Sequence, residues 1–399
     1  MPYDFETLPN RRGLGSSKWD AMLAERSDLP QDVVPLSVAD MELVNPPEVR
    51  RALHDLIEAG PLGYSSPTRR FFEACVSWQR RRHGWDPDPN WIVTSPGVVP
   101  ALHNAVRTLT SPGDGVVIQP PVYYPFRMAV ERSGRRVVEN PLVERDGRYE
   151  MDLEDLARKA ADPTVTMLIL CSPHNPVGRV WTRDELRSLL DICLANDVLV
   201  VSDEIHDDLI MPGHEHTTLM TLANEDEQRR LVVCVAPSKT FNLAGCQASV
   251  IYVPDERLRR AFAEGYDALG MHHLNAFAYA ATIAAYETGD QWLSELIDLV
   301  WENYRALASW ADAQGLGLRA FPLEGTYLGW VDFRSLGLGA DALERLMKDG
   351  ALLWLDEGKL FGEQGAGFER FNLACPTRVL ASALDRLEGA LRGLGKEGI

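Results

Sequence analysis

Short apolar runs alternate with longer amphipathic stretches between about residues 90 and 252. The runs are rich in β-branched residues and cover residues 91–94, 116–118, 166–170, 198–201, 231–235 and 249–253. Strands that are apolar along their whole length, with helices between them, predict a mostly parallel sheet that is covered on both faces. Thr182 and Glu185 have the spacing of a capping box, so we expect a helix from this point to about Asn196.

The pattern changes after about residue 290. Long helical segments follow at 292–313 and 340–349, with strands near Gly329 and Arg370 and a last helix from Arg378. This order indicates a smaller α+β domain, and a length of 399 residues agrees with two domains. We expect the N-terminal segment to join the small domain, a point that periodicity does not show. The predicted division is 48–288 for the large domain, and 1–47 with 289–399 for the small one.

Composition narrows the class of partner. Lys and Arg number 40 against 58 Asp and Glu, and the resulting net charge of −18 disfavours binding to nucleic acid or to an anionic membrane. There is no run of about 18 apolar residues, and the first residues lack the apolar stretch of a signal peptide, so we expect a cytoplasmic protein. The six cysteines form no CxxC pair, which favours reduced thiols in the core. A small molecule is therefore the expected partner.

Candidate site residues follow the strands, because ligands of a doubly wound sheet bind beyond the carboxyl ends of the strands. Gly97, Val98 and Val99 follow the strand at 91–94 and open an apolar helix, where free N–H groups can bind a phosphate. Asn175 lies in the loop CSPHNPVG between prolines and can donate a hydrogen bond to a phenolate oxygen. Each of these two fragments also fits a plain structural turn.

An acidic cluster follows the strand at 198–201. At a buried strand end Asp203 needs a cation, which makes it a candidate partner for a protonated ring nitrogen. With Glu204, His206 and Asp208 it could instead bind a metal, and a solvated acidic loop is a third interpretation. Alternation along a strand places Asp203 and Glu204 on opposite faces, which disfavours the metal, so we predict no metal site.

Lys239 follows the strand at 231–235, between a proline turn and an apolar stretch. A lysine amine in such a dry site can act as a nucleophile and form an imine. An ordinary surface lysine is the alternative. It is disfavoured because an imine-forming lysine, a carboxylate for a ring nitrogen, an amide donor and a phosphate-binding turn together are the set that pyridoxal 5'-phosphate requires.

Several motifs carry a resemblance to a known family. SPHNPVGRVWTRDEL, VVSDEIHDDL and APSKTFNLAG resemble the fold-type I pyridoxal-phosphate enzymes of the class I/II aminotransferase family, over nearly the whole chain. SKWD, SVADM, GYSSPT, PPVYYPF and GFERFNLACP are similar to its MalY/PatB-type cystathionine β-lyase branch. The resemblance implies an α/β fold, with a mostly parallel sheet in a large domain and a smaller α+β domain, and a homodimer with shared active sites.

The resemblance also implies a role for each site residue. Lys239 would bind the cofactor covalently and act in catalysis, Asp203 would pair with the pyridinium nitrogen, and Asn175 would donate to O3′ and help to bind the substrate. Tyr64 would reach the phosphate from the neighbouring subunit and take part in catalysis, and Arg378 would bind the substrate carboxylate. The implied cofactor-binding residues are Gly97, Val98, Val99, Tyr123, Asn175, Asp203, His206, Ser238, Lys239 and Tyr64.

Other interpretations and departures concern single positions. Tyr123, which would stack on the cofactor ring, could be core packing, and Arg378 could be a surface residue at a helix start. Gln247 stands eight positions after Lys239, where many aminotransferases have a phosphate-binding Arg, and His206 stands where many have Tyr; both favour the lyase branch. Glu42 stands where the branch usually has Asp followed by an aromatic residue, near the substrate side, which leaves the natural substrate open.

The expected activity is therefore a carbon–sulfur β-lyase that acts on L-cysteine S-conjugates such as cystathionine and releases thiol, pyruvate and ammonia. An aminotransferase, or another transformation of a cysteine conjugate such as decarboxylation with loss of the amine, would use the same groups. A regulatory protein that acts through a partner surface belongs to a different class. The presence of Lys239, Asp203 and Arg378 argues against a loss of activity but not against a second role.

Overall fold

The computed structural model describes residues 3–394. Its α-helices are α1 Ser17–Glu25, α2 Pro47–Glu58, α3 Arg69–His83, α4 Val98–Leu109, α5 Pro125–Glu131, α6 Leu153–Ala160, α7 Arg183–Ala195, α8 Glu225–Gln228, α9 Pro237–Thr240, α10 Glu256–Asp267, α11 Ala276–Thr288, α12 Asp290–Ala313, α13 Ala340–Arg345 and α14 Thr377–Leu394. Its strands are β1 Ile92–Ser95, β2 Gly115–Ile118, β3 Arg136–Glu139, β4 Val143–Arg145, β5 Arg148–Glu150, β6 Val165–Cys171, β7 Leu199–Asp203, β8 Leu231–Val235, β9 Ser249–Tyr252, β10 Arg319–Ala320, β11 Leu328–Asp332, β12 Asp356–Glu357 and β13 Phe368–Asn372.

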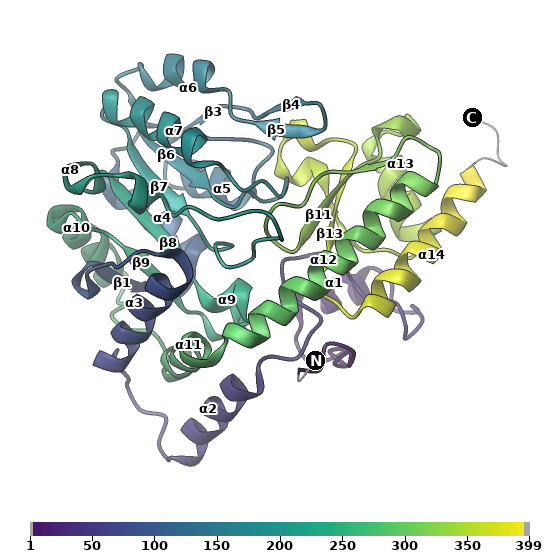
Figure 1. The fold of residues 1–399 in the computed structure, drawn as a ribbon, viewed down its shortest axis with the longest axis horizontal. Helices are drawn as coiled ribbons and strands as arrows, with labels where there is room; N and C mark the ends of the chain where they lie inside the picture. Colours follow the sequence, from purple (N-terminus) through teal and green to yellow (C-terminus); the bar gives the residue numbers. More distant parts are fainter. Residues whose placement is uncertain (1–2, 395–399) are drawn as a thin grey trace.

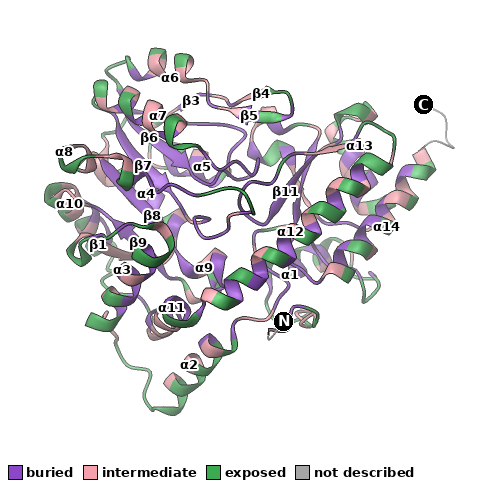
Figure 2. Ribbon diagram, in the orientation of Figure 1, coloured by how far each residue is buried: buried purple, intermediate pink, exposed green. Residues whose placement is uncertain are grey.

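A seven-stranded sheet forms the centre of the larger part, with the order β1-β9-β8-β7-β6-β2-β3. Strands β8, β7, β6, β2 and β3 run parallel, and β9 runs antiparallel to both of its neighbours. Alternate side chains enter two cores: Val116 and Ile118 pack on the side of α4 and α5, while Val117 packs on the side of α6 and α7. Figure 2 shows the central strands, such as β7 and β8, buried along their length and the helices exposed on their outer faces. The predicted mostly parallel, doubly covered sheet is confirmed.

The helix predicted from the capping box is also present. The Thr182 hydroxyl accepts a hydrogen bond from the Glu185 amide at 3.2 Å, and the Glu185 carboxylate accepts one from the Thr182 amide at 2.8 Å. Leu186, Leu189 and Leu190 are buried on the inner face of α7. The helix predicted at 340–349 is shorter as an α-helix, because α13 ends at Arg345 and the chain continues as a π-helical turn at Leu346–Gly350.

A four-stranded antiparallel sheet, β10-β11-β13-β12, lies beside the large sheet, and the long helix α12 runs diagonally across the view near α14 (Figure 1). Residues 36–42, here called the front segment, run along this second sheet. The Asn372 amide donates to the Leu36 carbonyl at 2.9 Å, and the Glu42 amide donates to the Ala374 carbonyl at 3.0 Å. The N-terminal residues therefore pack with the C-terminal part of the chain, while the division at residues 48 and 289 stays a prediction.

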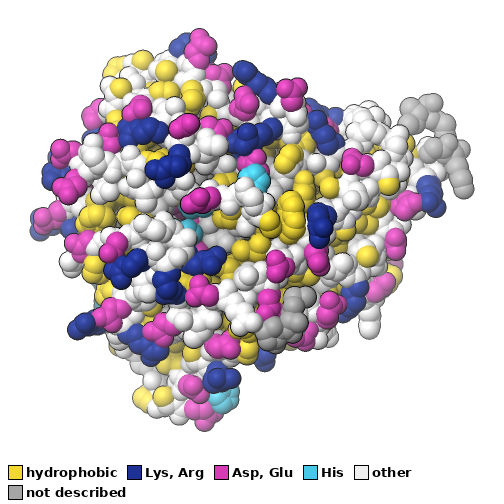
Figure 3. Space-filling view, viewed as in Figure 1, with side chains coloured by type: hydrophobic (Ala, Val, Ile, Leu, Met, Phe, Trp, Pro, Cys, Tyr) yellow, Lys and Arg dark blue, Asp and Glu magenta, His cyan; other side chains and the backbone are white. Residues whose placement is uncertain are grey.

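Basic and acidic side chains are interspersed over the face in Figure 3, without a broad basic patch. Between residues 3 and 394, no helix combines the length and the apolar character that crossing a bilayer requires.

Candidate active site

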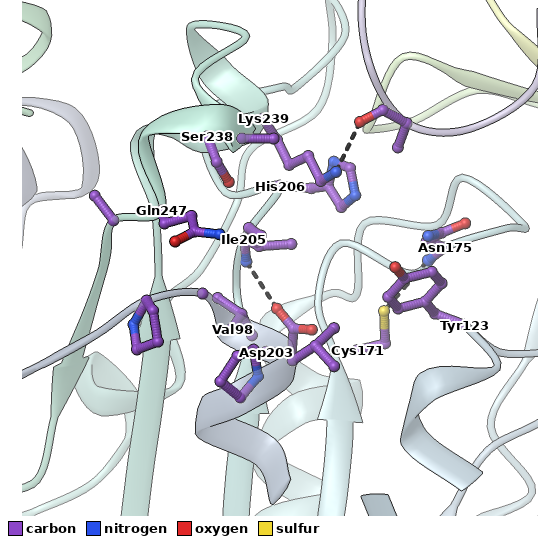
Figure 4. Close-up of a pocket in the computed structure, with 17 residues that line it drawn as sticks. Val98, Tyr123, Cys171, Asn175, Asp203, Ile205, His206, Ser238, Lys239 and Gln247 are labelled. Carbon is purple, nitrogen blue, oxygen red and sulfur yellow. Dashed lines mark hydrogen bonds between the residues drawn. The ribbon is translucent and has the colours of Figure 1, made fainter. Parts of the chain in front are cut away.

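Strands β1, β6, β7 and β8 all end at one edge of the large sheet, and the residues after them surround a cavity (Figure 4). The cavity is closed on one side by Ala39 of the front segment. Its lining includes Gly97, Val98, Val99, Tyr123, Asn175, Asp203, His206, Ser238, Lys239 and Gln247. Apart from Gln247, these are the expected cofactor-binding residues, and Tyr64 alone of that expected set is absent from the lining.

Lys239 lies in the short helix α9, directly after the buried strand β8. Its amine donates a hydrogen bond to the Ala39 carbonyl at 2.7 Å, which holds the side chain across the cavity. Burial lowers the pKa of Lys239 to about 8, and the nearby charge of Arg370 acts in the same direction. A substantial fraction of this amine is therefore neutral near physiological pH, as a nucleophile or a proton acceptor requires.

Asp203 ends β7 with its carboxyl group toward the cavity and only 4% of the residue exposed. One carboxylate oxygen accepts a hydrogen bond from the Ile205 amide at 3.1 Å, but no basic side chain within residues 3–394 forms an ion pair with it. Burial therefore raises the pKa of Asp203 to about 7. A buried carboxylate without a cation is costly, so this position fits a ligand that brings a protonated ring nitrogen.

His206 and Asn175 present polar groups to the same space. His206 is 2% exposed, and its Nδ1 atom has no hydrogen-bond partner among the described residues. Burial, together with the charges of Lys239 and Arg370, holds the pKa of His206 well below its usual value, so the ring is neutral. Asn175 accepts a hydrogen bond from Arg370 at 2.8 Å through Oδ1, which leaves its amide nitrogen as the end that can donate to a ligand.

A phosphate-sized anion fits where α4 begins. Gly97 is the N-cap of α4, so the amides of Val98 and Val99 lie in the first turn, where the helix leaves N–H groups without carbonyl partners. Ser238 and Gln247 line the same part of the cavity, and Gln247 has a left-handed backbone, with φ of 54°. These groups, the unpaired Asp203 and the Lys239 amine fit the phosphate, the ring nitrogen and the aldehyde of pyridoxal 5'-phosphate.

Arg378, which was expected to bind the substrate carboxylate, does not line the cavity. Arg378 is exposed at the start of α14, and its guanidinium donates to the Glu6 carbonyl at 3.4 Å, away from the residues that line the cavity. Arg370 of β13 is buried instead and donates to Asn175. Arg378 is therefore a surface residue at a helix start, which was the alternative interpretation. Arg370 instead places its guanidinium beside the cavity. An arginine in a strand buried along its length was the signal that could have found it.

A network behind the cavity holds the helix of Lys239. The Thr240 hydroxyl donates to Asp208 at 2.8 Å, and Asp208 also accepts from the Trp78 indole at 3.0 Å and lies 3.0 Å from His83 Nε2. Glu204 points away from the cavity and bonds to His216 at 3.1 Å. The acidic residues that could have formed one metal site are therefore divided between two sides of the strand end, as alternation along the strand predicted.

The comparisons with known proteins agree with this geometry. Residues 31–387 match the model of the family described as aminotransferase class I and II. The chain belongs to this family. Cystathionine β-lyase PatB of Bacillus subtilis is 42% identical over 97% of the chain and 100% of its own length, and protein MalY of Escherichia coli is 30% identical over 98% and 100%. The crystal structure of cystalysin from Treponema denticola, which contains a pyridoxal 5'-phosphate cofactor, covers 99% of the chain and 100% of its own, with a TM-score of 0.97 and 42% identity.

These matches confirm the predicted class I/II aminotransferase family, its fold-type I architecture and the resemblance to the PatB and MalY branch. Within the family fold, Gln247 lines the cavity at the position where the sequence analysis noted a missing arginine. Glu42, the other departure, does not face the cavity: it is 1% exposed and is bound by Lys18 at 2.9 Å and by the Trp19 indole at 3.1 Å. The Glu42 side chain therefore helps to fix the front segment, and the natural substrate stays open.

Tyr64 lies outside the Lys239 cavity of its own chain. It is fully exposed between α2 and α3, beside a surface hollow that Met271 and His272 also line. This hollow shares Gln247 and Pro96 with the lining of the cavity, so the two spaces adjoin.

Proposed function

We propose that this protein is a pyridoxal-phosphate-dependent carbon–sulfur β-lyase for S-conjugates of L-cysteine, with cystathionine as a representative substrate. The observation that carries the proposal is the convergence of Lys239, Asp203 and Asn175 on one cavity, in a chain that matches a cystathionine β-lyase over its whole length. The reaction would consume one water and release a thiol, pyruvate and ammonia.

The residues of the cavity would hold the cofactor by its distinct groups. Lys239 would bind its aldehyde carbon, Asp203 its ring nitrogen, and Asn175 its phenolate oxygen, while Tyr123 would pack on the ring. The first turn of α4 and Ser238 would bind the phosphate. When bound, pyridoxal phosphate supplies an electron-withdrawing ring that stabilises negative charge on the Cα atom of an amino acid.

The chain's own groups would then orient the substrate and move its proton. Arg370 and Asn175 would bind the α-carboxylate, which fixes the Cα–H bond relative to the ring. The Lys239 amine, with its pKa lowered to about 8, would accept the Cα proton at near-neutral pH. The sulfur would then depart as a thiolate if the Cβ–S bond is aligned with the π orbitals of the ring. Return of the proton to another atom would give transamination, so the same residues also support an aminotransferase.

Product analysis separates the two activities. The protein, loaded with pyridoxal phosphate, is incubated with L-cystathionine and other S-substituted cysteines, with and without an added α-keto acid, and the products are identified by mass spectrometry. Pyruvate and free thiol in the absence of an acceptor support the lyase. An intact S-substituted keto acid that forms only with the acceptor would overturn the lyase and establish an aminotransferase.

We also propose a homodimer in which Tyr64 reaches the cofactor phosphate of the other subunit. The support is its complete exposure beside a hollow that adjoins the cavity. Tyr64→Ala and Lys239→Ala should each be inactive, whereas a mixture refolded together should recover about a quarter of the wild-type activity, because half of the dimers are mixed and each has one complete site. No recovery in a mixture that forms dimers would exclude the shared site. A cytoplasmic location stays a prediction.

A further inference from the structure

Asp356 connects the buried arginine to the front segment. It lies on β12 directly opposite Arg370 on β13. Its Oδ2 atom pairs with Nη2 of Arg370 and also accepts a hydrogen bond from the Val38 amide at 2.7 Å. One carboxylate oxygen is thus shared between a guanidinium beside the cavity and the backbone that precedes Ala39.

One of the donors of the Arg370 guanidinium lacks a hydrogen-bond partner among the described residues. Nη1 donates to Asn175 at 2.8 Å and Nη2 to Asp356, while Nε is buried without a hydrogen-bond partner among residues 3–394. The ring of Phe361 lies 4.7 Å below the guanidinium carbon and keeps that face dry. A carboxylate binds an arginine most strongly through two parallel hydrogen bonds, and the pair formed by Nε and Nη2 has one donor free and one occupied by Asp356.

The other partner of Asp356 is held in an unusual backbone conformation. Val38 has φ of 57°, a left-handed conformation that a β-branched residue rarely adopts. Its carbonyl accepts from the Asn372 side chain at 2.8 Å, and the next carbonyl, that of Ala39, accepts from Lys239. The bond from Val38 to Asp356 therefore helps to place the carbonyl that contacts the lysine amine.

We propose that Asp356 is a resident carboxylate of the Arg370 site: it occupies Nη2 before the substrate binds, gives up that donor to the substrate α-carboxylate, and keeps its bond to Val38. This inference rests on the proposed function, in which Arg370 binds the α-carboxylate. Asp356 is then a residue that sets affinity, because its negative charge opposes every incoming carboxylate and limits how tightly an amino acid binds.

The test is Asp356→Asn, which removes the charge but keeps an oxygen that can accept from Val38. We expect the inhibition constant of 3-phenylpropionate, a carboxylate without an amino group, to fall by about tenfold, and the KM of the amino-acid substrate to fall by a similar factor, with kcat changed less than about twofold. The thermal midpoint of the protein should rise more with 3-phenylpropionate in the variant than in the wild type, a readout that needs no turnover. Asp356→Ser, which also lacks the charge, should bind the carboxylate more tightly as well. Glu363→Gln removes one exposed negative charge from the same part of the chain and should leave these constants unchanged.

Unchanged or weaker binding of 3-phenylpropionate by both Asp356 variants would overturn the proposal and make Asp356 a residue that only orients Arg370. Tighter binding of the same size in Glu363→Gln would also overturn it, because the effect would then be one of overall charge. The outcome does not depend on which reaction follows: the carboxylate measurement can fail while the protein is a lyase, and it can succeed if product analysis establishes an aminotransferase.

Discussion

Replacement of Asp203 by Asn should stabilise the cofactor-free protein at alkaline pH while it abolishes activity. Burial raises the pKa of this carboxyl group from 3.8 to about 7. Between these two values the unfolded chain has lost its proton and the folded chain has kept it, so the free energy of unfolding falls as the pH rises. The difference is about 3 pKa units (7 − 3.8), and at about 1.36 kcal/mol for each unit the cost reaches at most about 4 kcal/mol above pH 7. Asn has the same shape and still accepts from the Ile205 amide, but it has no proton to lose.

The assay is urea unfolding of the cofactor-free wild type and Asp203→Asn at pH 5.0 and at pH 8.5. The stability advantage of the variant should grow by about 3 kcal/mol between these values, because about two of the pKa units lie above pH 5. Asp298→Asn, on the exposed side of α12, removes the same charge and should show no such growth. In the cofactor-loaded protein the order should reverse, since the wild-type carboxylate then has its cation. An advantage that does not change between pH 5.0 and 8.5 would refute the idea that Asp203 is held uncompensated.

Three other predictions follow from the same geometry. Arg370→Ala should raise the KM for an amino-acid substrate by about 100-fold because it removes a buried charged donor, whereas Arg378→Ala should change it less than about twofold; equal effects in steady-state kinetics would contradict this assignment. Lys18→Met should lower the free energy of unfolding by about 3 kcal/mol, because it removes a cation from the buried Glu42 carboxylate. Chemical denaturation measures this change, and an unchanged midpoint would show that the other partners of Glu42 compensate its charge without Lys18. The rate at which the cofactor-free protein takes up pyridoxal phosphate, followed by absorbance, should rise up to about pH 8 and then level off, because the neutral amine of Lys239 is the nucleophile; a rate that still rises above pH 9 would place that pKa higher.

The large sheet and the site residues at its strand ends could be predicted from the sequence because both depend on local patterns. A buried strand is a continuous apolar run, and a polar residue just after it stands out, as Asn175, Asp203 and Lys239 do. Helix α11 left no comparable signal, since AFAYAATIAAYET is apolar nearly all round and is packed against α2 and α3.

The choice between Arg370 and Arg378 could not be made from periodicity. Arg370 lies within β13 and Arg378 follows it, and the pairing of β12 with β13 shows that Arg370 stands opposite Asp356. The direction of the Glu42 side chain could not be predicted for a similar reason. It depends on contacts with Lys18 and Trp19, which lie in helix α1, far from Glu42 in the local sequence pattern.

The two walls of the cavity differ in their proposed roles: one binds the cofactor and the other, which includes the front segment, contacts the substrate. The groups proposed to bind the cofactor stand on strand ends of the large sheet, and Thr240 and Asp208 brace them from behind. The opposite wall is built by the front segment, residues 36–42. It is bonded to Asp356 and Asn372 of the second sheet, and also to Lys239 and Asn242. A substitution in that wall that leaves the Ala39 carbonyl and Arg370 in place can thus change which amino acid is admitted without moving Lys239 or Asn175. Chains with this arrangement can diverge in substrate while they keep one chemistry, and libraries intended to redirect this protein should be confined to the wall formed by the N-terminus and β12–β13.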